Sequence, residues 1–188
     1  MKASFSPDTY EFFIGDSAGN TIQKLVDQSD TVYTEKYRDR AKELGLTDYE
    51  IITIASIIQK EAANDDQMKT ISAVIHNRLD DTVSFPYLGC QSTADYITNK
   101  VAPSLSSTSA HTADYYMQFY NTTSKTTQRG LPPGPICCPG KAAIEAALYP
   151  SKSSAKYFFH DNEGVMYTAT SQYEFHHKVE KYAPYLEY

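Results

Sequence analysis

The sequence predicts an α+β fold, in which a helical subdomain is combined with a long ordered loop region and a small β-hairpin. Apolar residues recur at helical spacing between residues 48 and 79. Residues 82–140 are rich in Ser, Thr, Pro, Gly and Tyr, a composition typical of loops. Two β-favouring stretches flank turn residues at 161–164. With 188 residues the chain is too short for two full-sized cores, so we expect a single domain over residues 1–188.

The first half of the chain is expected to be mostly helical. Thr47 and Glu50 form a capping box ahead of an apolar run, because the hydroxyl and the carboxylate can each accept from a free amide at a helix start. Residues 64–66, Asn-Asp-Asp, are expected to cap a second helix that pairs antiparallel with the first. The predicted elements are a strand at 9–14, helices at about 20–29, 33–44 and 48–63, and a further helix from the cap at 64–66 to about 80.

The second half combines the long loop region with short elements. Low-complexity linker is one interpretation of residues 82–140, but their embedded Tyr, Phe and Leu side chains favour an ordered loop, and ordered long loops usually carry function. After it, we expect an Ala-rich helix at 141–148, strands at 156–160 and 165–169, and a final helix at 172–182.

Composition and charge exclude several classes of function. The formal net charge of −6 and the pI near 5.3 argue against nucleic acid as a partner, which would need a basic surface. No apolar run reaches membrane-spanning length and the N-terminus lacks a signal peptide, so the chain is either cytosolic or an excised fragment. The three cysteines show no pair of C-x-x-C units, which argues against a structural zinc site.

Glu61 is the best candidate for a chemically active side chain. On a helix that advances 100° per residue, it falls about 20° from the centre of an apolar stripe at Ile54. The same stripe contains Ile51, Ile57, Ile58 and Ala62. A carboxyl group beside isoleucines loses hydration, which disfavours its ionised form and suits a proton donor. The alternative is that Glu61, in the last helical turn, reaches solvent or pairs with Lys60 or Arg78.

Several motifs together resemble one known family. Residues 55–62, Ala-Ser-Ile-Ile-Gln-Lys-Glu-Ala, resemble the helix that carries the catalytic glutamate of the YceG-like transglycosylases. Residues 5–10 and 74–79 resemble that family's opening strand and its next helix. The most specific match is Gly-Leu-Pro-Pro-Gly-Pro-Ile at residues 130–136, after Tyr-Asn-Thr at 120–122. The matches follow the family's order along nearly the whole chain.

This resemblance implies an endolytic peptidoglycan transglycosylase, a lyase that cuts glycan strands between N-acetylmuramic acid and N-acetylglucosamine and leaves 1,6-anhydro ends. Glu61 would serve as both acid and base, with no metal or other cofactor. Peptidoglycan glycan strands would be the main partner, and cell-wall synthesis proteins are further candidates. The family's anchor helix and LysM-like domain are absent from the sequence. We therefore expect a catalytic fragment of an envelope protein at the outer face of the cytoplasmic membrane, attached only through a missing N-terminal anchor.

The resemblance also suggests residues that line the glycan groove. Asn77, Gln91 and Asn121 are candidate hydrogen-bonding residues, and Tyr120 is a candidate stacking surface. Each has a structural alternative, since Asn and Tyr in loops often satisfy backbone groups. Arg78 is expected to be a surface helix arginine rather than the partner of a stem-peptide carboxylate.

The chain departs from the family pattern in two places. In the tail, Met166 stands where a His is expected in the hairpin, and the family's Glu-His pair becomes Glu-Phe-His-His at residues 174–177. Where the family has Leu-Gln-x-Asp-x-Thr, residues 88–93 replace the glutamine by Gly89 and the aspartate by Gln91. Gln91 can still form hydrogen bonds but cannot carry a negative charge. Cys90 and Cys138 are additional to the family's motifs, and the oxidising location that the resemblance implies suggests a disulfide between them.

Three competing functions follow from the same residues. A non-catalytic cell-wall glycan-binding module would keep the fold and lose turnover, but it would not need a desolvated acid. A metallohydrolase could use His76, His111, His160, His176 and His177, but no H-E-x-x-H or similar ligand spacing is present. An aminodeoxychorismate lyase would need a pyridoxal cofactor and a lysine Schiff base, for which the sequence gives no support.

Overall fold

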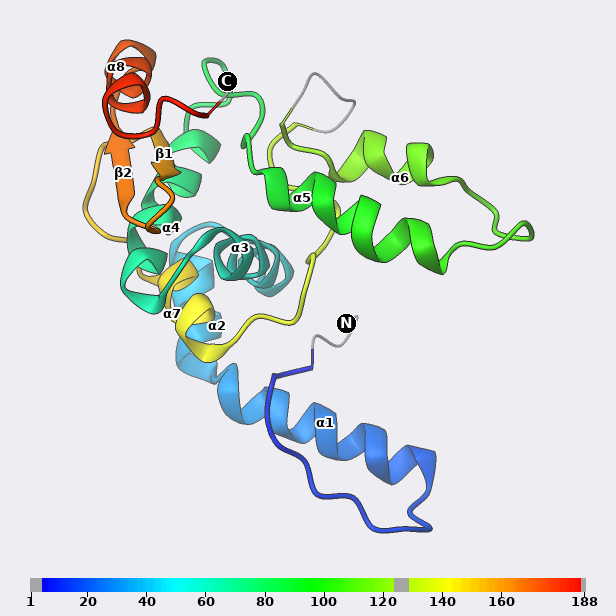
Figure 1. Cartoon of the computed structure of the whole chain (residues 1–188). Coiled ribbons are helices and arrows are strands. Elements are labelled where there is room, and N and C mark those ends of the chain that lie inside the picture. The colour runs from blue at the N-terminus through cyan, green and yellow to red at the C-terminus, as the bar shows by residue number, and fades with distance from the viewer. Residues whose placement is uncertain (1–4, 124–128, 187–188) are drawn as a thin grey trace.

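The computed structural model describes residues 5–123 and 129–186 and shows a mainly helical protein with one small sheet (Figure 1). This arrangement confirms the predicted α+β class. The helices are α1 Ala18–Val32, α2 Glu35–Glu43, α3 Asp48–Glu61, α4 Asp65–Leu79, α5 Gln91–Tyr96, α6 Ala113–Tyr120, α7 Lys141–Leu148 and α8 Gln172–Tyr182. A π-helical turn η1, Ile97–Val101, and a 3₁₀ turn η2, Ala102–Ser104, follow α5, and the strands are β1 Tyr157–His160 and β2 Met166–Ala169.

The core forms where α3, α4 and α7 pack against one another. α3 begins at the predicted capping box, with Thr47 Oγ1 accepting from the Glu50 amide and Glu50 Oε2 accepting from the Thr47 amide. Seven of its fourteen residues are buried, including four isoleucines that each contribute roughly 1.5–3 kcal/mol by burial. This packing fixes the direction of α3 and therefore the position of its last residue, Glu61.

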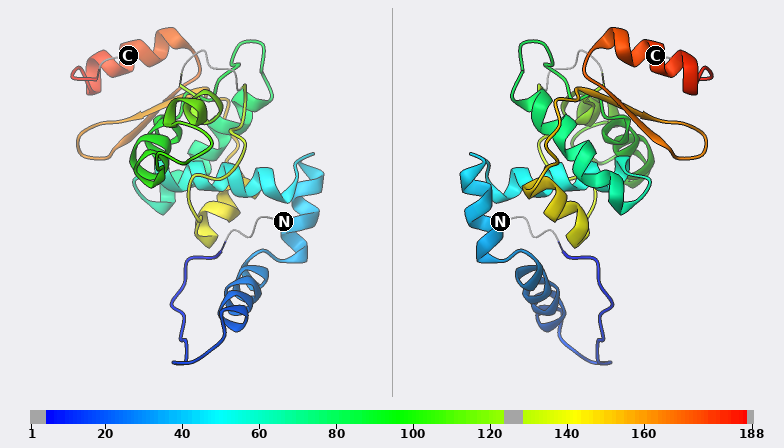
Figure 2. Two further views of the ribbon diagram at one scale, coloured as in Figure 1. Left: turned by 90° about the vertical axis from the view of Figure 1, so that its right-hand side faces the viewer. Right: turned by 90° about the vertical axis from the view of Figure 1, so that its left-hand side faces the viewer.

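The N-terminal region differs from the prediction. The strand predicted at 9–14 is wrong: these residues form an extended segment and a turn with no strand partner, and Phe12, Phe13 and Ile14 are exposed. A β-favouring composition produces a strand only where a neighbouring strand supplies hydrogen bonds. This segment and α1 project from one end of the molecule, and the hairpin with α8 lies at the other end (Figure 2).

The region 82–140 is ordered as expected but is not a continuous loop. It contains α5, η1, η2 and α6. α5 and η1 together span only residues 91–101, and α6 has eight residues rich in aromatic side chains, so neither shows a long apolar stripe. The sequence does contain one indication of α6. Thr112 is a typical N-cap residue, and its Oγ1 accepts from the Tyr115 amide at the start of this helix.

The C-terminal elements confirm the prediction closely. β1 and β2 pair antiparallel with Phe159 opposite Tyr167, and α8 spans the predicted residues. Phe159 and Val179 form a second, smaller core between the hairpin and α8. α7 also has its predicted bounds.

Three smaller expectations have different outcomes. The disulfide is wrong, since all three cysteines are free: Cys90 is buried while Cys138 is exposed. Asn64 occupies the predicted cap position of α4, but its side chain makes no capping hydrogen bond. Within the described residues, no helix combines the length and apolar character needed to cross a bilayer.

Candidate active site

Glu61 is the last residue of α3, and its carboxylate is partly buried. Its Oε1 atom accepts two hydrogen bonds from one residue, at 2.7 Å from Ser92 Oγ and at 3.2 Å from the Ser92 amide. It forms no ion pair with Lys60, Arg78 or any other described residue. The alternative in which Glu61 pairs with a neighbouring cation is therefore wrong, and the carboxylate is held by neutral donors.

The two oxygens of the Glu61 carboxyl group have different surroundings. Oε1 accepts both hydrogen bonds from Ser92. Oε2 accepts no hydrogen bond from the described residues, so one carboxyl oxygen is oriented and the other is available to a ligand.

His160 lies close to Glu61 at the end of β1. Burial lowers the pKa of the His160 imidazole, and the nearby Glu61 carboxylate acts in the opposite direction. The His160 Nε2 atom is 2.9 Å from Gln67 Oε1, and the Gln67 amide donates to the carbonyl of Gly164. Gln67 thus connects the start of α4 to the hairpin and fixes the imidazole beside the carboxylate.

Cys90 is a buried residue near Glu61. Its side chain is 2% exposed, and burial raises the pKa of the thiol, with a further contribution from Glu61. A thiol that resists ionisation is a weak nucleophile, so Cys90 has a packing role here. The backbone around it is tied to the next segment, because the Cys90 amide donates to Thr122 Oγ1 at 3.2 Å.

A cavity of about 400 Å³ is lined by Ser92 but not by Glu61 itself. Ser92, which holds Glu61, also lines the cavity, so the two features are contiguous. The walls come from the end of α3, from α5 and η1, and from residues 130–140, which we call the proline-rich segment. The lining residues are Lys60, Ser92, Asp95, Tyr96, Asn99, Lys100, Ile136 and Cys137. Its volume lies within the range of roughly 300–1,000 Å³ that is usual for ligand pockets.

The proline-rich segment is held against α3 by two polar side chains. The Ile136 amide donates to Ser56 Oγ at 3.0 Å, and the Gly140 amide donates to Gln59 Oε1 at 3.0 Å. Ser56 is completely buried, so its hydroxyl pairs a backbone amide that water cannot reach. The segment therefore forms a fixed wall of the cavity.

Of the predicted binding residues, Gln91, Tyr120 and Asn121 lie near the cavity wall or behind it, and none of the three lines the cavity. The Gln91 amide donates to Asp95, which lines the cavity. Tyr120 packs behind Tyr96 with ring centroids 5.4 Å apart, and burial raises the pKa of its hydroxyl to about 12. Tyr96 is thus the aromatic side chain that lines the cavity, and Tyr120 supports it. Asn121 follows Tyr120, and its Oδ1 accepts from the Thr123 amide at 2.8 Å.

Asn77 and Arg78 serve the packing of α4. The Asn77 amide donates to the carbonyls of Ser153 and Ala155, at 2.8 and 2.9 Å. Arg78 is not the surface arginine that we predicted, since burial lowers the pKa of its guanidinium, which donates to the carbonyls of Leu88 and Lys156. Neither residue lines the cavity beside Glu61.

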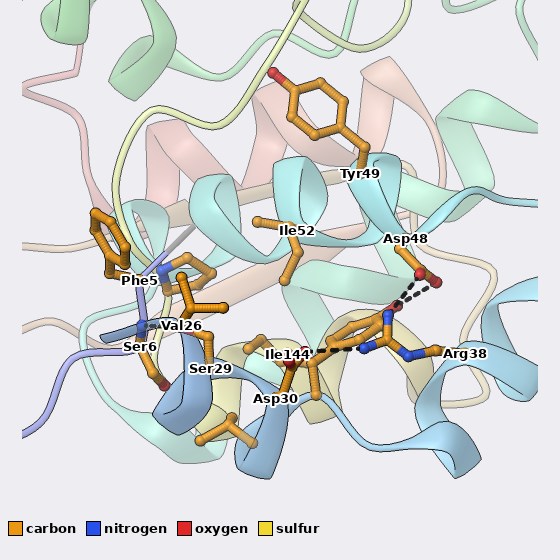
Figure 3. A pocket seen from close by; sticks show the side chains of 13 residues that line it. Phe5, Ser6, Val26, Ser29, Asp30, Arg38, Asp48, Tyr49, Ile52 and Ile144 are labelled. Atoms are coloured by element: carbon orange, nitrogen blue, oxygen red, sulfur yellow. Dashed lines mark hydrogen bonds and ion pairs between the residues drawn. The ribbon is translucent and has the colours of Figure 1, made fainter. Parts of the chain in front are cut away.

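A second pocket lies at the other end of α3 (Figure 3). It is mostly apolar, and its two acidic residues, Asp30 and Asp48, both pair with Arg38, at 3.2 and 3.0 Å. Thirteen residues separate Asp48 from Glu61, which corresponds to about 20 Å along a helix. This pocket is therefore separate from the carboxylate site. Within the described ranges, no three His, Cys, Asp or Glu side chains are grouped to hold a metal ion.

Comparison with known proteins agrees with these motifs. The model of the YceG-like family matches residues 1–181. The chain belongs to the YceG-like family. A solved structure of a putative YceG-like protein from Listeria monocytogenes is 31% identical, with a TM-score of 0.73 over 94% of this chain and 54% of that one.

Two relatives of this chain carry the name endolytic murein transglycosylase. The Bacillus subtilis protein is 29% identical over 97% of this chain, and the Streptococcus pneumoniae protein is 28% identical over 92%. The chain spans 48% and 30% of the lengths of these two relatives.

Gly89, where we expected a departure from the family pattern, has a clear structural setting. Gly89 has a φ of +69°, and a Cβ atom built there would lie 2.6 Å from Arg78 Nη1. A glutamine at this position would require both a strained backbone and a displaced arginine. Arg78 can therefore occupy its buried position because residue 89 is a glycine.

Proposed function

We propose that this chain is an endolytic lytic transglycosylase of peptidoglycan. It would cut between N-acetylmuramic acid and N-acetylglucosamine and leave 1,6-anhydro-muramic ends, as a carbon-oxygen lyase acting on polysaccharide. The observation that supports this most directly is the carboxyl group of Glu61, which is oriented by Ser92, a residue that also lines a cavity. The names of the two relatives support the same class of substrate.

One carboxyl group is sufficient for this reaction. Neutral Glu61 would donate its proton to the oxygen that leaves the muramic anomeric carbon. The resulting carboxylate would then accept the proton of the muramic 6-hydroxyl as that oxygen attacks the same carbon. Glycosidases that use water commonly need a second carboxylate as nucleophile or base. Here the substrate supplies the nucleophile, and no water is consumed.

Ser92 would hold the Glu61 carboxyl group in the same orientation during both proton transfers. Its hydroxyl and amide hold Oε1 and leave Oε2 to face a ligand. Ser92 is thus a positioning residue in this proposal, and the muramic residue would lie against Glu61 beside the cavity that Ser92 lines.

Digestion of purified glycan strands tests the proposal. Mass analysis of the ends should show anhydro-muramic products, whereas reducing ends would indicate hydrolysis. Glu61→Gln keeps the volume of the side chain and removes its titratable proton, so cleavage should fall at least about 10²- to 10⁴-fold while glycan binding persists. Glu50→Gln is the matched control, because Glu50 caps the other end of the same helix.

Two outcomes would contradict parts of this proposal. Anhydro products formed at the parent rate by Glu61→Gln would show that another group is the catalyst. Binding of strands by the parent chain without any cleavage would favour the glycan-binding module. The proposed envelope location depends on peptidoglycan being the substrate. Failure to cut purified strands would therefore remove the support for that location.

A further inference from the structure

The cavity that Ser92 lines contains two lysines that form no ion pair with a described residue. Lys60 extends from the last turn of α3, and Lys100 extends from η1. Neither side chain forms an ion pair or hydrogen bond with another described residue. Asp95 is the acidic residue of the lining, and its Oδ1 accepts from the Gln91 amide at 3.0 Å. The lining therefore carries two cations and one carboxylate.

This local charge is opposite to that of the whole chain. The protein has 17 Lys and Arg residues against 23 Asp and Glu, a formal net charge of −6. Elsewhere several lysines lie within 4 Å of a carboxylate, as Lys42 does with Asp39 and Lys178 with Glu174. A cavity of the opposite sign attracts anions, and its concave walls strengthen this attraction relative to a flat surface.

We infer that this cavity binds a carboxylate carried by the lactyl arm of the muramic residue, with Lys60 and Lys100 as its specificity-determining partners. The inference rests on the proposed function, since it assumes that muramic acid is bound at Glu61. Cleavage at the muramic anomeric carbon puts that sugar against the carboxyl group, and its lactyl arm starts on the same ring. Because Ser92 contacts Glu61 and also lines the cavity, the arm needs to extend only into the adjoining space.

Two sources can supply this carboxylate. On intact strands the lactyl group is amide-linked, so only the stem peptide carries free carboxylates. On strands stripped by an amidase, the lactyl carboxylate itself becomes free. Tyr96 and Ile136 provide apolar wall for either arm, and Asn99 provides an amide for hydrogen bonding. The shared ligand chemistry is one carboxylate between two ammonium groups.

Three substrates of equal strand length separate these sources. The first carries unmodified stem peptides, the second carries stems whose carboxylates have been converted to carboxamides, and the third has been stripped by an amidase. Parent KM should be lowest for the unmodified strands and higher for the amidated strands. A low KM on stripped strands identifies the lactyl carboxylate as an additional ligand, and a high KM assigns the contact to the stem peptide. Added salt should raise KM only where a carboxylate is bound.

The variants Lys60→Gln and Lys100→Gln remove one ammonium group each. Exposed ion pairs are weak, so each change should raise KM on unmodified strands roughly two- to fivefold, and the double variant about tenfold. Amidation should have no further effect on the double variant. Lys60→Arg should retain the preference, because it keeps the charge. Lys152→Gln removes an exposed lysine outside the cavity lining and should behave as the parent.

A binding measurement separates this inference from the proposed function. N-acetylmuramyl-L-alanyl-D-glutamate and its diamide can be titrated calorimetrically into Glu61→Gln and into Glu61→Gln carrying both lysine changes. The dicarboxylate should bind the first variant more tightly than the diamide does, and the double lysine change should abolish the difference. Equal binding of both compounds, or unchanged KM in the double lysine variant, overturns the inference even if strands are cut. Carboxylate-dependent binding without anhydro products would instead refute the proposed function.

Discussion

Two buried serines on neighbouring helices allow a matched test of how the cavity wall is held. Ser56 on α3 and Ser72 on α4 are both 0% exposed. The Ser56 hydroxyl donates to the Thr53 carbonyl at 2.7 Å and accepts from the Ile136 amide at 3.0 Å. The Ser72 hydroxyl has no hydrogen-bond partner among the described residues. The same substitution, serine to alanine, should therefore have opposite effects at the two sites.

The magnitudes follow from these hydrogen bonds. Ser56→Ala leaves the Ile136 amide buried and unpaired, which should lower the free energy of unfolding by about 1–3 kcal/mol. Ser72→Ala removes a hydroxyl that is desolvated without compensation, so its effect should lie between neutral and about 1 kcal/mol stabilising. For a chain of this size, 1 kcal/mol corresponds to about 2–4 °C in Tm. The two variants should thus differ by several degrees.

Thermal and urea unfolding of the parent and both variants provide the measurement. The urea midpoint should move without a change in slope, since neither substitution changes the surface exposed on unfolding. Ser56→Ala should also reduce cleavage of glycan strands, because Ile136 lines the cavity and its anchor is lost. Ser72→Ala should leave cleavage unchanged. Equal Tm shifts for the two variants would refute the role assigned to the Ser56 hydrogen bonds.

Two further predictions concern stability. Gly89→Ala should lower Tm more than Gly45→Ala, although both glycines have a φ near +70°, because only at Gly89 does the new Cβ meet Arg78; equal losses would remove the steric part of the argument. The hydrogen bond from Lys178, together with those from Thr170, lowers the pKa of Glu174 to about 2 from its ordinary 4.5. The resulting stability is present above pH 4.5 and is lost as the pH falls towards 2, so Glu174→Gln should lower Tm at pH 7 but not at pH 2.

The elements that the sequence predicted best are those with local signals. The capping box at Thr47 and Glu50 involves residues three apart, and the hairpin turn lies within four residues. The helical stripe of α3 also depends only on spacing within one helix, and it was sufficient to direct attention to Glu61. The strand predicted at 9–14 failed for the complementary reason, because its formation depends on a partner elsewhere in the chain.

The surroundings of Glu61 could not be predicted because its partners are distant in sequence. Ser92 is 31 residues away and lies in a six-residue helix whose place depends on buried hydrogen bonds to Thr122. Asn77 shows the same limitation in reverse: a helix asparagine suits a substrate contact, but the carbonyls of residues 153 and 155, more than 70 positions away, use its amide. The periodicity of one helix can indicate a candidate carboxyl group. Tertiary contacts decide which residues lie near it: Ser92, not Asn77, contacts Glu61, and Tyr96, not Tyr120, lines the cavity.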